Sequence, residues 1–302
     1  MDLKIALDWT PNINHIGIFV ANELGYYENE DIQLKILNPL EDNYKVTPGK
    51  KLELGTVDFA ITPFESVISL NNKKNIVPAI AVFAILQEDI SSIASLKSLN
   101  LTSPKALDGR TYASYKARYE DLIVKEIVKS DGGKGDIKLI YPEKLGIWNT
   151  LLEGKADATW IFNNWEGVEA EQKHVPLNKF SMRDYGIPYC YSPVIIANNN
   201  LLQKNKTQYS QFIKATKKGY LYASEHKENA TAILSKYLTS YDKAHIDVLR
   251  AINITSSYFG DETTCGFMSS NRVEVFLKWL VAHKLEDKKI LDQKLFTNSL
   301  LV

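Results

Sequence analysis

The sequence predicts a two-lobed α/β protein, in which each lobe is a mostly parallel sheet flanked by helices and a ligand cleft lies between the lobes. Three observations support this prediction. The chain has 302 residues, more than one typical domain of about 100–200 residues. Short apolar strands alternate with amphipathic helices, which is the pattern of βαβ units. Hydrophobic residues make up 45% of the chain, enough for a sizeable core.

The first lobe is predicted to begin with a buried parallel strand at Leu3–Leu7, a short apolar run. A helix is expected over Asn14–Leu24, where Ile16, Phe19 and Val20 follow helical spacing and Gly25 ends the pattern. The same reasoning predicts strands at Ile32–Leu37, Val57–Ile61 and Val77–Leu86, and helices at Lys50–Leu54 and Glu65–Asn71.

The second lobe is predicted to begin near Ser92. Its expected strands are Thr111–Ala113, Ile137–Tyr141 and Ala156–Phe162, and its expected helices are Tyr119–Lys129 and Leu145–Leu152. The strand Val194–Ala197 then returns the chain to the first lobe, and the remainder is mostly helical, most clearly at Gln211–Glu225 and Arg272–His283. The predicted lobes are therefore residues 1–91 with 195–302, and residues 92–194, joined by two crossings that form a hinge.

Composition argues against some classes of partner. Lys plus Arg and Asp plus Glu both number 36, so the chain lacks the excess of basic residues that nucleic-acid binders usually carry. No apolar run approaches the roughly 18–20 residues of a membrane span. Met1 opens directly into a strand, without the basic and apolar regions of a signal peptide. We therefore expect a periplasmic or extracytoplasmic protein if a signal was removed, and a cytoplasmic one if Met1 is the native start.

Ligands of such folds bind beyond the carboxyl ends of the strands. The segments at those ends are Asp8–Asn14, Thr62–Glu65 and Gln87–Ile93. The first continues to His15, and its polar side chains and helix N-terminus suit a ligand cleft. The same residues equally fit a helix N-cap, at Asn12 or Asn14, beside a packed Trp.

Two further clusters are candidates for the cleft. In Asn163-Asn164-Trp165-Glu166-Gly167, a carboxylate beside an aromatic ring suits a flat heterocycle with an exocyclic amine. The alternative is a structural Glu at a helix N-terminus. The tyrosines of Tyr185–Ser192 either wall the cleft or only form a structural turn.

Catalytic and metal motifs are absent from the sequence. It contains no GxGxxG, GxxxxGK[ST], GxSxG or HExxH. The five histidines are scattered, and Cys190 and Cys265 have no spacing suited to zinc. His15 is the one histidine expected near the cleft. A lone histidine at the start of a helix is more often a packing or capping residue than a catalytic one. We expect no metal site and lean towards a binding protein rather than an enzyme.

Several motifs resemble the thiamine-pyrimidine family. They are Leu7-Asp8-Trp9-Thr10-Pro11-Asn12 with Asn14-His15, Gly55-x-Val57-Asp58-Phe59-Ala60, Leu107-Asp108-Gly109-Arg110, Gly154-x-Ala156-Asp157-Ala158, Asn164-Trp165-Glu166 and Asp184-x-Gly186-Ile187-Pro188. The matches run from about residue 3 to about residue 198. This family includes bacterial transporter proteins that bind formylaminopyrimidine and the eukaryotic thiamine pyrimidine synthases.

The resemblance implies a periplasmic-binding-protein type II fold and a small thiamine-related aminopyrimidine ligand, taken up or salvaged with an ABC permease as partner. It implies that Glu166 accepts from the ligand's amine while aromatic rings sandwich the pyrimidine. Together with the strand-end segments, the expected ligand-binding residues are Asp8, Trp9, Asn12, Asn14, His15, Thr62, Pro63, Glu65, Tyr115, Asn164, Trp165, Glu166, Tyr189 and Tyr191.

The chain departs from the synthases of that family at their reactive positions. The synthases use a lysine that carries pyridoxal phosphate and a histidine consumed as substrate, and this chain has Thr62 and Ser66 at those places. Their iron-binding cysteine-rich run is represented only by Cys190. Neither pyridoxal phosphate nor iron is therefore expected.

Two alternatives to a pyrimidine-binding protein stay open. The first is an enzyme of thiamine-pyrimidine biosynthesis that uses unrecognised residues. The second is a binding protein for another ligand, such as an alkylsulfonate, nitrate or a riboflavin-like molecule. Glu166 disfavours the anions, because like charges in a dry cleft repel.

Overall fold

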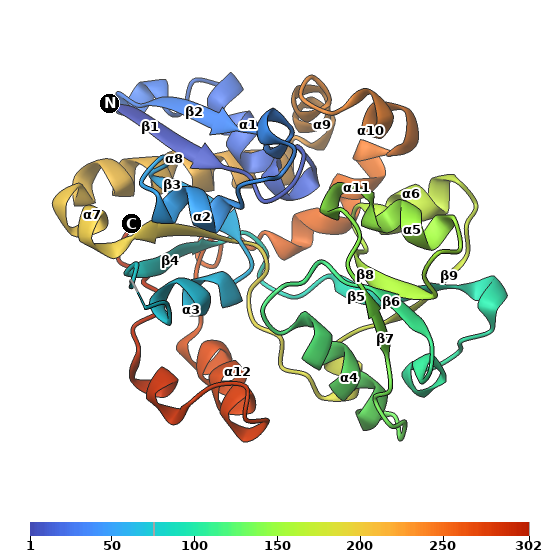
Figure 1. Ribbon diagram of the computed structural model, residues 1–302. Coiled ribbons are helices and arrows are strands. Elements are labelled where there is room, and N and C mark those ends of the chain that lie inside the picture. The colour runs from blue at the N-terminus through green and yellow to red at the C-terminus, as the bar shows by residue number, and fades with distance from the viewer. Residues whose placement is uncertain (75, 302) are drawn as a thin grey trace.

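The computed structural model describes residues 1–74 and 76–301, which form two lobes around two separate sheets (Figure 1). The strand order of the first sheet is β2-β1-β3-β10-β4, from β1 (Asp2–Ala6), β2 (Gln33–Leu37), β3 (Phe59–Thr62), β4 (Ala79–Ala84) and β10 (Val194–Asn198). The order of the second is β7-β6-β8-β5-β9, from β5 (Ser91–Leu96), β6 (Thr111–Ala113), β7 (Lys138–Ile140), β8 (Ala158–Phe162) and β9 (Leu177–Phe180).

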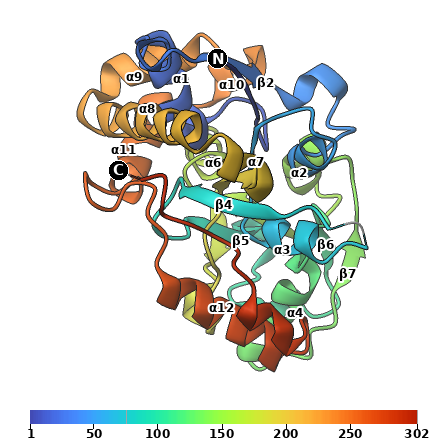
Figure 2. The same cartoon turned by 90° about the vertical axis from the view of Figure 1, so that its left-hand side faces the viewer.

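Helices cover both sheets. Those that follow strands of the second sheet are α4 (Glu120–Ser130), α5 (Ile147–Leu152) and α6 (Glu166–Gln172). The others are α1 (Ile16–Glu23), α2 (Pro48–Glu53), α3 (Glu65–Asn71), α7 (Asn199–Lys204), α8 (Lys206–Glu225), α9 (Lys227–Ser235), α10 (Ser240–His245), α11 (Val248–Thr255) and α12 (Ser270–Ala282). Within the described ranges, every helix is too short or too polar to cross a membrane. Helix α12 lies beside α4 in both views (Figures 1 and 2).

The sheets contain more antiparallel pairing than the expected mostly parallel arrangement. In the first sheet β1 pairs parallel with β2 and β3, whereas β10 runs antiparallel to β3 and β4. The second sheet repeats this pattern, with β5 antiparallel to β8 and β9. A strand that enters a lobe from the other lobe starts at the cleft and runs away from it, opposite to its βαβ neighbours. Both β5 and β9 are strands that the sequence patterning did not predict.

Two segments carry the chain between the lobes, one from β4 to β5 and one from β9 to β10. They are hydrogen-bonded to each other, since the backbone N–H of Ile85 donates to the carbonyl of Pro193 at 3.1 Å. Arg272 of α12 hydrogen-bonds to both segments. Its guanidinium donates to the carbonyl of Cys190 at 3.2 Å and also to that of Gln87. The crossings are therefore held as a pair, as a hinge requires.

Close packing of α1 on α8 positions the loop that follows β1. Gly17 and Gly219 allow the approach, because a Cβ on Gly219 would lie 2.0 Å from the carbonyl oxygen of Gly17. The neighbouring Tyr220 is fully buried and its hydroxyl donates to the carbonyl of Asn14 at 2.6 Å. The helix pair thus anchors Asn14 at the base of the first lobe's loop.

We predict that Gly219→Ala destabilises the protein by about 1–3 kcal/mol, because overpacking at a rigid backbone contact forces the two helices apart. Urea unfolding measures the change. The matched control is Gly49→Ala in α2, where the new Cβ would have only ordinary contacts, the nearest at 3.8 Å. That control should be neutral or slightly stabilising. Equal stability of Gly219→Ala and the parent protein would contradict the packing described for α1 and α8.

Candidate functional site

A cavity of about 180 Å³ lies between the lobes. It is smaller than the roughly 300–1,000 Å³ of pockets for drug-sized ligands, so it suits a small molecule. Both lobes contribute to its wall. The lining residues are Asp8, Trp9, Asn12, Asn14, Tyr44, Pro63, Glu65, Tyr115, Ala117, Glu120, Lys144, Trp160, Phe162, Trp165, Glu166, Tyr189 and Ser192.

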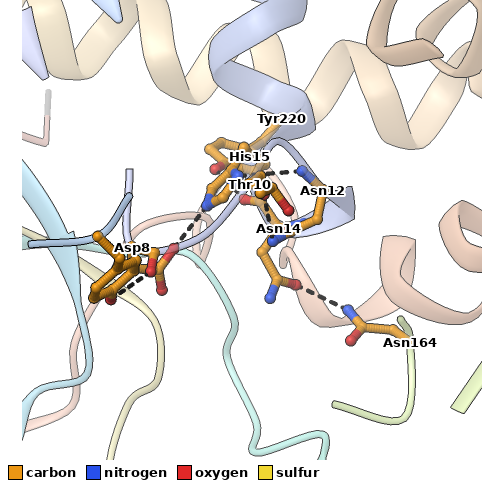
Figure 3. Close-up of polar contacts among 8 residues, drawn as sticks. Asp8, Thr10, Asn12, Asn14, His15, Asn164 and Tyr220 are labelled. Carbon is orange, nitrogen blue, oxygen red and sulfur yellow. Dashed lines mark hydrogen bonds and ion pairs between the residues drawn. The ribbon is translucent and has the colours of Figure 1, made fainter. Parts of the chain in front are cut away.

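The loop after β1 is held by its own side chains (Figure 3). Asn12 caps the short helical turn that follows, and its side-chain oxygen accepts from the backbone N–H of Asn14 at 2.9 Å. The Nδ1 of His15 accepts from the backbone N–H of Asn12 at 3.3 Å. Its Nε2 therefore carries the proton and donates to Asp8 at 2.7 Å. The loop is therefore both a helix N-cap and part of the cleft, because Asn12 caps the turn and also lines the cavity.

Hydrogen bonds cross the cleft and hold the lobes closed. The Nδ2 of Asn164 donates to the Oδ1 of Asn14 at 2.9 Å (Figure 3). It also donates to the hydroxyl of Thr255 in α11 at 3.0 Å. In another contact between the lobes, the hydroxyl of Tyr241 donates to Glu169 at 2.6 Å. The structure is therefore a closed form of the two-lobed fold.

Aromatic rings form much of the cavity wall. Trp9 of the first lobe meets Tyr115 of the second edge to face, with ring centroids 5.8 Å apart. Trp9 also contacts Tyr44, at 6.0 Å. Deeper in the second lobe, Trp160 packs against Tyr189 at 5.1 Å. Such ring faces from both lobes favour a flat ligand that stacks between them.

Four carboxyl side chains line the cavity, against one lysine. The Oε2 of Glu166 accepts from the backbone N–H of Phe162 at 2.9 Å. Burial raises the pKa of Glu166 to about 7, although that N–H opposes the change. Burial also raises the pKa of Glu120. Lys144 lies over the ring of Tyr44 at 5.1 Å, and burial lowers its pKa. Burial thus shifts these carboxyl groups and the lysine towards their neutral forms.

Ten of the predicted site residues are brought together in the lining: Asp8, Trp9, Asn12, Asn14, Pro63, Glu65, Tyr115, Trp165, Glu166 and Tyr189. The other four lie behind it. His15 is fully buried and bonds Asp8, while Asn164 is fully buried against Asn14. Thr62 is buried at the end of β3. Tyr191 turns away, so that its hydroxyl accepts from the backbone N–H of Ser269 and its ring lies under Arg272.

Seven lining residues were missed by the sequence reasoning: Tyr44, Ala117, Glu120, Lys144, Trp160, Phe162 and Ser192. Three of them stood beside predicted positions, because Trp160 and Phe162 end the strand before Asn164 and Ser192 follows Tyr191. Tyr44 and Lys144 lie in loops without a recognisable motif. For these two the sequence carried no usable signal.

The model of the NMT1/THI5-like family matches residues 12–230 of the chain. The protein belongs to the NMT1/THI5-like family. This confirms the resemblance to the thiamine-pyrimidine family, and the matched residues include the motif from Asn164 to Glu166.

Family members similar to this chain include binding proteins and synthases. A formylaminopyrimidine-binding protein of Halalkalibacterium halodurans is 22% identical, over 98% of this chain and 89% of the relative. A 4-amino-5-hydroxymethyl-2-methylpyrimidine phosphate synthase of Saccharomyces cerevisiae is 24% identical, over 92% of this chain and 80% of the relative.

Solved structures confirm the predicted fold class. The ligand-binding component of an ABC-type import system from Staphylococcus aureus, crystallised with zinc, superposes with a TM-score of 0.73 at 17% identity. The superposition covers 100% of this chain and 98% of that one. This NMT1/THI5-like protein thus has the periplasmic-binding-protein fold.

We predict that Asn14 and Asn164 are energetically coupled across the cleft. In a double-mutant cycle with Asn14→Ala and Asn164→Ala, urea unfolding should give a coupling energy of about 0.5–1.5 kcal/mol. The control cycle mutates Asn163 in place of Asn164, because the side chain of Asn163 donates hydrogen bonds to Ile90 and Ser92 and not to Asn14. Asn163→Ala should add to Asn14→Ala within about 0.5 kcal/mol. Additivity in both cycles would mean that the lobes are not held together in this way.

Proposed function

We propose that the cleft binds a small thiamine-related aminopyrimidine, and that the protein serves as a solute-binding protein for the uptake or salvage of a thiamine precursor. In that role it works outside the cytoplasmic membrane and delivers its ligand to an ABC permease. Similarity to a formylaminopyrimidine-binding protein over nearly the whole chain supports this proposal. So does the fold shared with a component of an ABC import system.

The observation that carries the proposal is the position of Glu166. It lines a small aromatic-walled cavity, and the N–H of Phe162 occupies one of its two carboxyl oxygens. The other oxygen is left to accept from a ligand. An aminopyrimidine offers two flat faces for stacking and an exocyclic amine that donates at its edge. Shape and hydrogen-bonding capacity therefore agree at this position.

The charge of the cavity supports a neutral or cationic ligand over an anion. Asp8, Glu65, Glu120 and Glu166 face the ligand space, and Lys144 supplies the single cationic side chain of the described lining. A sulfonate, a nitrate or a phosphate would have to leave water beside these carboxyl groups with one counter-charge. We therefore place alkylsulfonates and nitrate below the aminopyrimidines as ligands.

A synthase reaction receives less support. Thr62 and Ser66 stand where the family's synthases have their lysine and histidine, and neither a Thr nor a Ser forms a Schiff base. Burial raises the pKa of Cys190 to about 12, which keeps this thiol protonated and unsuited to bind iron. We propose that neither pyridoxal phosphate nor iron takes part in the protein's function.

We predict that Glu166→Gln weakens binding of 4-amino-5-hydroxymethyl-2-methylpyrimidine by about 1–3 kcal/mol. Because the N–H of Phe162 selects the amide oxygen, the variant turns its NH₂ into the cavity, where it has nothing to accept with. Titration calorimetry measures the dissociation constants. A pyrimidine without the 4-amino group serves as control and should bind both proteins within a few-fold. An unchanged constant for the aminopyrimidine would remove Glu166 from the proposed contact.

A further inference from the structure

Glu65 is a buried carboxyl whose hydrogen-bonding capacity is only partly used by the described residues. It is the first residue of α3, it lines the cavity from the first lobe, and it is 3% exposed. Its Oε2 has no hydrogen-bond partner among the described residues. Burial of such an atom is costly unless a donor reaches it. The free oxygen of Glu65 is therefore available to accept a hydrogen bond from a ligand.

The carboxyl that faces Glu65 from the second lobe is already satisfied. Glu120 accepts from the hydroxyl of Tyr112 at 2.9 Å and from the backbone N–H groups of Tyr115 and Ala117, each at 3.1 Å. It also lines the cavity. Two carboxyl groups thus interact in a desolvated space. Glu120 has three donors, whereas the Oε2 of Glu65 has none among the described residues.

Among the described residues, the cation that faces Glu65 is Arg118, and its guanidinium is already bonded to other partners. The titratable groups that face Glu65 are Glu120 and Arg118 from the second lobe, and Tyr189 from the segment that returns to the first. The guanidinium of Arg118 is bonded to Glu286 and to the hydroxyl of Tyr119. Burial first, and Glu120 second, raise the pKa of Glu65 to about 8, although the charge and the backbone N–H of Arg118 oppose the change. In the unliganded protein at neutral pH, Glu65 is therefore mostly protonated.

A positively charged donor is the partner that relieves this arrangement most. An ammonium group gives charge-assisted hydrogen bonds, which are roughly twice as strong as neutral ones. It also offsets the repulsion between Glu65 and Glu120. A hydroxyl or an amide N–H can hydrogen-bond to the free oxygen while Glu65 stays protonated, but it does not compensate the charges of Glu65 and Glu120 when both are ionised.

We propose that Glu65 binds a protonated primary amine on the ligand, so that the cleft selects aminomethyl-pyrimidines over neutral hydroxymethyl and formylaminomethyl analogues. This inference rests on the proposed function and specifies the substrate class of the same site. Glu166 of the second lobe holds the ring amine, and Glu65 of the first lobe holds the side-chain ammonium. Each lobe thereby binds one end of the ligand, which links recognition of both ends to closure.

Titration calorimetry at pH 7 with 4-amino-5-aminomethyl-2-methylpyrimidine and its hydroxymethyl and formylaminomethyl analogues tests the proposal. The three share the ring and therefore the contact with Glu166. We expect the aminomethyl compound to bind about tenfold more tightly, or more, than either neutral one. Glu65→Gln should reduce that ratio to within about threefold while the hydroxymethyl compound still binds, which also shows that the variant folds. Glu274→Gln, an exposed carboxyl on α12, should leave the ratio unchanged.

Proton release gives a second readout on the unaltered protein. Because free Glu65 is mostly protonated at pH 7 and must ionise beside the ammonium, the aminomethyl ligand should release about one proton more than the hydroxymethyl ligand. Titrations in buffers of different ionisation enthalpy measure this number. Equal affinity and equal proton release for the charged and neutral ligands would overturn the inference and leave the proposed function standing. Binding of none of these pyrimidines would overturn both.

Discussion

The cost of taking carboxyl groups out of water governs this structure. Closure of the lobes buries Glu65, Glu120 and Glu166 around one small cavity. A buried carboxyl needs hydrogen-bond donors. The described residues give three donors to Glu120, one backbone N–H to Glu166, and none to the Oε2 of Glu65. We propose that a ligand supplies the remaining donors, which favours an amine-bearing molecule over an anion.

The architecture around that cavity follows from how the chain passes between the lobes. The strands β1 and β3 run towards the cleft and deliver Asp8 and Glu65 to it, whereas β5 and β10 start at the cleft and run away. Helix α12 ties the two crossings together through Arg272. Packing of α1 on α8 fixes the backbone of Asn14, which then meets Asn164 of the other lobe. In this loop, the same residue is therefore fixed by the packing of the fold and lines the cavity.

The alternation of strands and helices was enough to predict the fold class, but not every strand. Strand β5 escaped because its sequence, Ser91-Ser92-Ile93-Ala94-Ser95-Leu96, lacks a strong apolar pattern, although it lies between β8 and β9 and is almost wholly buried. Tertiary position overrides local propensity there. Strand β9 is short and half exposed, with Asn178 and Lys179 in it.

The sequence predicted the site residues that lie just after predicted strands. Asp8–Asn14 and Trp165–Glu166 directly follow strands, so their position at the cleft could be inferred. Glu120 could not, because it begins an amphipathic helix, and an acidic residue in a first turn is ordinary there. The sequence predicted His15 and Asn164 as ligand-binding residues, but both lie behind the cavity lining. In a sequence, a polar residue that holds the lining in place cannot be distinguished from a polar residue that forms it.

The most direct test of the proposed ligand class is a calorimetric titration of the protein with 4-amino-5-hydroxymethyl-2-methylpyrimidine and, separately, with ethanesulfonate. These two ligands separate the carboxyl-lined cleft proposed here from the anion-binding alternative on the same fold, because ethanesulfonate is an anion without an amine. We predict that the pyrimidine binds with saturable heat, one molecule per chain, and is recovered unchanged, while ethanesulfonate gives no heat of binding. Binding of ethanesulfonate without binding of the pyrimidine would contradict this prediction.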